Sequence, residues 1–296
     1  MKSFAFSSFL TLAAAGSLLA QDGIPASDAA SQAPDNKPFA VNTEAWDSFV
    51  SFNGERIFGD PKEHNFIPAV AYYSSYTVSG KRVAKSTIVP SFSTNGPMFG
   101  GEGYGTITGV LPLEGDFVNQ LNFNGGWKYN LMEYLGLDVG GGFSFYSENS
   151  FGDGQPNQFG SYYRNKIYFG LIGRVPLSPA AYAVYDMQLE QIKFVAGVSE
   201  TIDLAEDWSI FGEGRFGYAS ANSYLGDSRA PLAGKWSNGY AYWLLSADLR
   251  WNAYKGLVLT AGVGYTGNND GTRGIANIDL GPENTVYGKF SVSYSF

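Results

Sequence analysis

The sequence of 296 residues contains no cysteine and a single histidine. Without cysteine the chain has no disulfide, no thiolate metal site, no cysteine nucleophile and no lipid-anchored cysteine. One histidine excludes a metal site built from several imidazoles. Only 16% of the residues are charged and the formal net charge is −8. Nucleic acid is therefore not an expected partner, because phosphate binding needs a basic face.

Long apolar runs are absent after the N-terminus. Residues 1–20 carry Lys2, an apolar stretch from Phe4 to Leu19, and Ala20 before Gln21. This pattern predicts a signal peptide cut after Ala20. The alternative, an anchoring helix, is disfavoured because the run is shorter than the roughly 20 residues of a membrane span. No later stretch could cross a bilayer as a helix, so we expect an exported protein that is either soluble or a β-barrel.

What the chain has in abundance is glycine (38), phenylalanine (22) and tyrosine (20), a composition that favours β-structure. Residues 133–147 alternate strictly, with Leu135, Leu137 and Val139 on one face and glycine, Asp138 or serine on the other. Alternation with period two predicts a strand with one apolar and one polar face. Such segments run roughly 10–15 residues here, the length of a tilted strand that crosses a membrane.

The segments and their connections predict an all-β fold, a transmembrane antiparallel up-and-down barrel of about 12 strands, with 10 or 14 as alternatives. Residues 21–65 are expected to be a flexible periplasmic segment that could lead into the lumen, and residues 66–296 to form the barrel. Short turns are expected near Asn95–Pro97 and at four further joints, and longer polar loops at 148–161, 221–238 and 268–283. The predicted strands are 66–78, 82–93, 98–110, 116–129, 133–147, 161–175, 179–187, 190–203, 207–220, 239–253, 256–267 and 284–296.

The last strand carries the most specific motif. Phe290, Val292, Tyr294 and the terminal Phe296 share one face, opposite Lys289 and three serines. This ending resembles the C-terminal assembly signal of Gram-negative outer-membrane β-barrel proteins. The resemblance implies location in the outer membrane of a Gram-negative bacterium, recognition by the barrel assembly machinery and contact with outer-membrane lipid.

Aromatic residues next to the predicted short turns are typical of a girdle at the membrane interface. The residues concerned are Trp127, Tyr129, Tyr134, Trp208, Trp251 and Tyr254.

Charged residues within the strands are expected to face the lumen, because Lys or Arg facing lipid costs about 2–4 kcal/mol at the membrane midplane. Arg164, Lys166 and Arg174 are expected on one wall that attracts anions. The alternative is a closed interior, with the pairs Glu213/Arg215 and Asp248/Arg250 cross-linking neighbouring strands. The lumen-lining candidates are Glu102, Lys128, Asp138, Arg164, Lys166, Arg174, Lys193, Glu213, Arg215, Asp248, Arg250 and Lys289.

Three functions are compatible with these features. A porin-like passive or weakly selective channel for small polar solutes comes first. A closed structural or adhesive barrel that acts through its extracellular loops comes second. An enzyme at the rim comes last, because His64 is the chain's only histidine and no Ser or Asp partner can be assigned to it. We therefore expect no catalytic, metal or cofactor site, and the loop from Asn268 to Gly271 lacks the spaced acidic ligands of a calcium loop.

Overall fold

The computed structural model describes residues 65–114, 119–146, 162–187, 190–220, 239–269 and 284–296. The predicted signal peptide, residues 21–64 with His64, and most of the three long loops lie outside these ranges. Within them, the chain forms a closed antiparallel barrel of twelve wall strands, in the order β1-β14-β13-β12-β11-β10-β9-β8-β7-β6-β5-β4. The predicted fold class and strand number are therefore confirmed. No helix able to cross a membrane occurs in the described ranges.

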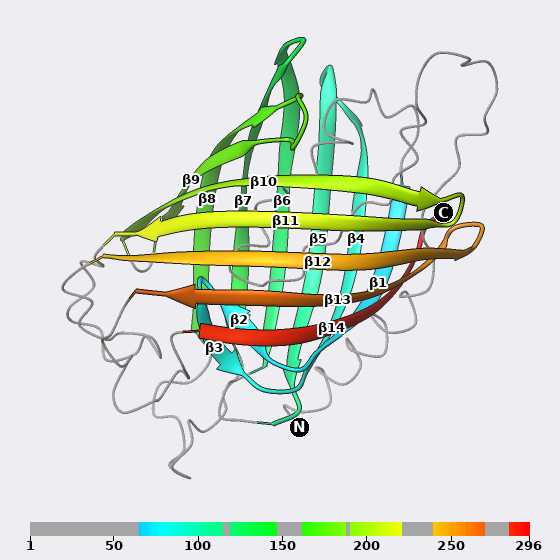
Figure 1. Cartoon of the computed structure of the whole chain (residues 1–296). Helices are drawn as coiled ribbons and strands as arrows, with labels where there is room; N and C mark the ends of the chain where they lie inside the picture. The colour runs from blue at the N-terminus through cyan, green and yellow to red at the C-terminus, as the bar shows by residue number, and fades with distance from the viewer. Residues whose placement is uncertain (1–64, 115–118, 147–161, 188–189, 221–238, 270–283) are drawn as a thin grey trace, which may run out of the picture.

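Each wall strand pairs with the wall strands that precede and follow it in the sequence. In Figure 1, β10–β14 cross in front of β4–β8 at a steep angle. The wall strands are β1 (Asn65–Tyr73), β4 (Thr87–Met98), β5 (Gly101–Pro112), β6 (Gln120–Met132), β7 (Leu135–Tyr146), β8 (Tyr162–Gly173), β9 (Ala180–Asp186), β10 (Gln191–Ala205), β11 (Trp208–Ala219), β12 (Tyr240–Tyr254), β13 (Leu257–Asn268) and β14 (Asn284–Tyr294).

The barrel closes between the first and last strands. Val70 lies opposite Val292 in the β1–β14 register. Beyond this ladder, the Phe66 and Phe296 main chains exchange two hydrogen bonds, 3.2 and 3.3 Å long. Their rings stack with centroids 5.7 Å apart. Closure removes the exposed sheet edge that would otherwise pair with other chains.

One predicted turn is misplaced. The sequence suggests a turn at Asn95–Pro97, but β4 continues through Met98, and Pro97 pairs with Glu102 of β5. The turn lies instead at Phe99 and Gly100, whose φ values are 49° and 76°. Two consecutive residues with positive φ make a tight hairpin turn that matches the strand twist. Such a turn needs no proline, so Gly96 and Pro97 wrongly indicate a turn at a place where the strand continues.

A second departure from prediction is an extra hairpin between β1 and β4. The sequence predicts wall strands at 66–78 and 82–93. In the structure the chain leaves the wall after Tyr73 and returns to it at Thr87, and these two residues pair with each other. The residues between form β2 (Tyr76–Val78) and β3 (Lys81–Ala84), a separate two-stranded sheet. Figure 1 draws this hairpin next to β13 and β14. Its turn also uses positive φ, at Ser79 (47°) and Gly80 (76°).

Candidate functional site: the barrel interior

The barrel wall is polar inside and apolar outside, the reverse of a soluble protein. Outward positions carry large apolar side chains that remain exposed, such as Phe194 (55%), Phe216 (57%) and Leu245 (58%). Among the described wall strands, Glu200 is the only charged residue at an outward position. Its carboxylate accepts a hydrogen bond from the Leu177 main-chain N–H, 2.8 Å away in the β8–β9 turn. This polarity is the one that a lipid environment selects.

Most of the predicted lumen-lining residues are buried within the barrel. Glu213 and Lys289 are only partly buried, yet both form ion pairs with inward-facing partners. Arg174 is the exception, because it lies exposed in the turn after β8, where its main-chain N–H bonds the Tyr134 carbonyl at the short-turn rim. The fully buried members are Glu102, Lys128, Asp138, Arg164, Lys166, Lys193, Arg215, Asp248 and Arg250.

The predicted anion-attracting wall of Arg164, Lys166 and Arg174 is therefore wrong in two respects. Arg174 belongs to the opposite end of β8, since strand alternation places a residue on a face but does not fix where the strand ends. Arg164 forms an ion pair with Asp186 of β9. Lys166 pairs in register with the same Asp186. Because Asp186 offsets positive charge here, this wall is much less basic than the sequence suggests.

Two further ion pairs lie on the opposite wall. Glu213 pairs with Arg215 on the same strand, β11, rather than across strands. Asp248 of β12 pairs with Lys289 of β14 at 2.5 Å. The predicted Asp248/Arg250 pair is not what the structure shows, because Arg250 lies over the Phe211 ring, 4.2 Å from its centre.

A buried carboxylate organises the inner wall from β5 to β9. Asp138 of β7 accepts hydrogen bonds from the hydroxyls of Tyr104, at 2.7 Å, and Tyr182, at 2.9 Å. Tyr104 also bonds the Tyr168 hydroxyl. Lys128 lies opposite Asp138 in the β6–β7 register, and its Nζ sits 4.6 Å from the centre of the Tyr104 ring. This Asp138 network joins four strands besides β7 and neutralises a charge that would be costly alone.

Inward-facing tyrosines lie over glycines of the neighbouring strand. Tyr182 is opposite Gly170, and a Cβ at Gly170 would come within 2.2 Å of the Tyr182 ring. Tyr242 lies opposite Gly217 in the same way, and a Cβ at Gly217 would come within 2.1 Å of the Tyr242 ring. These glycines let aromatic rings lie flat against the wall. The same arrangement recurs at Tyr104/Gly126, Tyr168/Gly140 and Tyr287/Gly264.

The β2–β3 hairpin enters the interior and reaches the far wall. Lys193 Nζ of β10 donates to Ser79 Oγ at 2.7 Å. Asn268 Nδ2 of β13 donates to the Gly80 carbonyl at 2.9 Å. Tyr76 at the hairpin's base is fully buried and packs edge-on against Tyr73 of β1, with ring centroids 5.8 Å apart. Since β1 and β10 stand on different sides of the barrel, the hairpin crosses the lumen.

An uncharged polar wall lines β4 to β7. Its side chains are hydroxyls and amides, all buried except the partly buried Thr106, and it contains no formal charge between Glu102 at one end and Arg164 at the other. The lumen-lining residues predicted from the sequence are all charged and do not include this wall. The signal was present in the alternation of serine, threonine and asparagine. Its members are Ser91, Ser93, Thr106, Thr108, Gln120, Asn122, Asn124 and Ser144.

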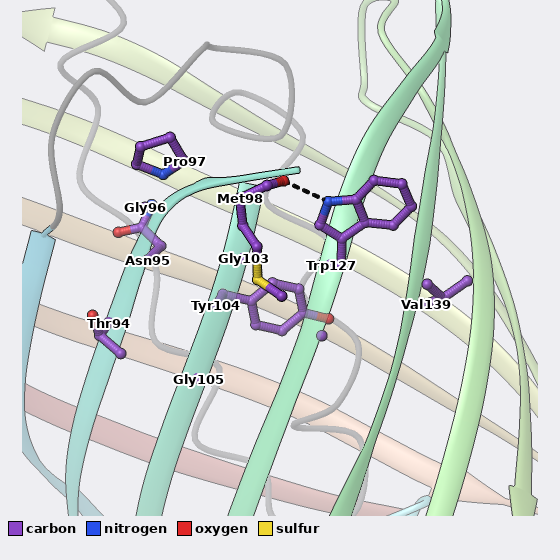
Figure 2. A pocket seen from close by; sticks show the side chains of 11 residues that line it. Thr94, Asn95, Gly96, Pro97, Met98, Gly103, Tyr104, Gly105, Trp127 and Val139 are labelled. Atoms are coloured by element: carbon purple, nitrogen blue, oxygen red, sulfur yellow. Dashed lines mark hydrogen bonds between the residues drawn. The ribbon is translucent and has the colours of Figure 1, made fainter. Parts of the chain in front are cut away.

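A groove of about 720 Å³ lies at the short-turn end of β4 to β7. In Figure 2 the Trp127 indole points toward the end of β4, where its Nε1 donates to the Met98 carbonyl at 2.8 Å. The Met98 side chain covers Gly103, since a Cβ there would lie 2.5 Å from the Met98 sulfur. Because its one indole donor is already bonded and its outward side chains are apolar, we assign no chemistry to this groove.

The described residues contain no cluster of three or more His, Asp or Glu side chains able to hold a metal ion. The chemistry available in the described interior is therefore that of ion pairs, tyrosine hydroxyls, amides and alcohols.

No protein-family model matches the sequence, and no curated protein matches it. Solved structures with a similar architecture include the NanC porin, 12% identical over 77% of this chain and 97% of its own, with a TM-score of 0.44. The KdgM porin is 11% identical over 78% and 99%, with a TM-score of 0.45. The translocator domain of the autotransporter NalP from Neisseria meningitidis is 10% identical over 81% and 91%, with a TM-score of 0.49. The likeness is one of barrel architecture.

Proposed function

We propose that the chain is an outer-membrane pore for small polar solutes. The observation that carries the proposal is the polarity of the wall: buried charges, hydroxyls and amides face inward, and outward positions are mostly apolar, with Glu200 the only charged residue among them in the described wall strands. An inward charged surface is costly where its groups are not paired or hydrogen-bonded, unless water or solute shares the lumen with it. The proposal includes export through the predicted signal peptide and insertion guided by the C-terminal strand that ends in Phe296.

The proposed pore has a weak preference for anions. Among the described wall strands, seven basic and five acidic side chains are buried inside the barrel or form ion pairs there, an excess of two positive charges. Three of the acids are bound in ion pairs with three of the bases, which reduces the field each exerts on a passing ion. The β2–β3 hairpin crosses the lumen, and we place the narrowest part of the pore at its tip near Ser79 and Lys193.

Solute flux tests this proposal. The refolded mature chain is inserted in liposomes loaded with an impermeant polymer, and swelling is followed in solutions of small neutral and anionic solutes. We expect swelling that slows as solute size increases, as for a water-filled pore. Liposomes with inserted barrel that swell no faster than empty liposomes would refute the proposal. Heat-modifiable mobility on a gel serves as the control for folding and insertion.

A closed barrel that acts through its loops is the second candidate. The observation that favours it is how much apolar and aromatic material lies inside. Tyr76 of the hairpin, Tyr146 and Tyr287 belong to one buried cluster, and Tyr168, Tyr182 and Tyr242 belong to another. A barrel of this kind would be impermeable in the liposome experiment, so one measurement separates the two candidates. A catalytic role is not proposed, because His64 lies outside the described residues.

A further inference from the structure

Four uncharged polar residues lie side by side in one row across β4 to β7. Ser91 is opposite Thr108, Thr108 opposite Asn122, and Asn122 opposite Ser144. All four are at most 1% exposed. Adjacent strands are about 4.8 Å apart, so the row extends for about 14 Å along the inner wall.

Each residue of this row has a polar atom without a protein partner. Ser91 Oγ, Thr108 Oγ1, Asn122 Nδ2 and Ser144 Oγ make no hydrogen bond within the described part of the chain. Gln120 Nε2 donates to Asn122 Oδ1 at 2.6 Å. Gln120 Oε1 remains buried without a partner among the described residues.

The wall continues toward the short-turn end with two more acceptors. Asn95 Nδ2 donates to Glu102 Oε1, so Asn95 Oδ1 and Glu102 Oε2 remain buried without a partner among the described residues. A buried polar atom with no partner is rare in native proteins, because its desolvation is not offset. Seven such atoms on four adjacent strands indicate a surface shaped to meet hydrogen-bonding groups from outside the wall.

We propose that this polar wall is a binding site for a neutral, hydroxyl-rich solute of the size of a short oligosaccharide. The inference rests on the proposed function and names the class of solute that the pore takes. Hydroxyls donate and accept, as does the wall, which offers three alcohols, one amide donor and two amide acceptors. An anionic solute fits less well, because Glu102 and the neighbouring Asn95 amide oxygen present only acceptors at the short-turn end of the wall.

Maltotriose is a suitable probe, because it is neutral, hydroxylated and soluble. Binding to the full mature chain in detergent is measured by calorimetry, and block of ion current is measured in planar bilayers. We expect saturable binding and a matching current block. Asn122→Leu and Thr108→Val should each weaken binding about tenfold, as expected for the loss of one hydrogen bond in a buried site.

The matched control is Thr260→Val, at an inward position of β13 on the opposite wall. It should leave maltotriose affinity unchanged. The milder pair Ser91→Ala and Ser144→Ala covers the case in which the larger substitutions prevent folding. No maltotriose binding to a barrel that conducts salt would overturn the inference while leaving the pore intact. Equal losses in Asn122→Leu and Thr260→Val would also overturn it, whereas absence of salt conductance would count against the pore itself.

Discussion

At the scale of single residues, glycines on the inner face make room for tyrosine rings, a role that the sequence does not reveal. Alternating glycines suggest a spacious lumen, yet several are covered by tyrosine rings from the next strand. Gly170 and Gly217 are examples, under Tyr182 and Tyr242. The sequence shows that these glycines face inward, but the pairing register that puts a ring over each one comes only from the folded sheet.

Gly170→Ala is expected to destabilise the barrel by about 1–3 kcal/mol, because the new methyl group would overlap the Tyr182 ring. Gly212→Ala is the control, since a Cβ there has no heavy atom within 4 Å. Urea unfolding of both variants in lipid vesicles, followed by tryptophan fluorescence, gives the comparison. Equal stabilities of the two variants would contradict the ring-over-glycine packing.

The Asp138 network makes a second prediction at this scale. Asp138→Ala should lower the free energy of unfolding by about 3–5 kcal/mol, because it removes the carboxylate that lies opposite buried Lys128 and accepts hydrogen bonds from Tyr104 and Tyr182. The double variant Asp138→Leu/Lys128→Met should recover part of that loss, since the ammonium that faced Asp138 is removed with it. The same unfolding measurement decides the matter, and a double variant less stable than Asp138→Ala would show that the pair is not coupled.

At the scale of elements, strand pattern predicts most of the wall and fails at its insertions. The long strands after residue 116 are predicted to within a few residues, because each carries many alternating positions. The segments before residue 110 alternate poorly, and the residues from Tyr73 to Thr87 are mistaken for the ends of two wall strands. What separates the β2–β3 hairpin from the wall is tertiary: Tyr76 packs inside the barrel, and Ser79 is held by Lys193.

Release of the hairpin tip should widen the pore. Lys193→Met removes the donor to Ser79 and keeps the length of the side chain. We expect higher single-channel conductance or more frequent steps to a larger open level. Lys166→Met is the control, because it removes an inward lysine on β8 without touching the hairpin tip. Conductance that changes equally in both variants would assign the effect to lost charge rather than to the hairpin.

At the scale of the whole molecule, the sequence predicts a closed antiparallel barrel with twelve wall strands, and the structure confirms it. The candidate site is predicted less well. The charged candidates other than Arg174 lie on the inner face as expected, but the sequence predicts neither their pairing nor the uncharged wall of β4 to β7. Both depend on which strands become neighbours at which register, and hydropathy alternation carries no information about either.

The assembly signal makes a prediction at the same scale. Phe296→Ala removes the ring that stacks on Phe66 where the barrel closes. We expect a lower fraction of inserted, heat-modifiable protein after expression with a signal peptide. Phe216→Ala, another exposed outward phenylalanine far from the seam, is the control. Equal fractions of inserted protein for the two variants would show that Phe296 is not part of the assembly signal.

The most direct test of the central claim is single-channel recording of the mature chain in a planar bilayer under a salt gradient. The inward charge excess predicts discrete open steps and a reversal potential of the sign that indicates a weak preference for anions. Complete silence from protein shown to be folded and inserted would contradict the pore. A strong preference for cations would contradict the charge distribution assigned to its lumen.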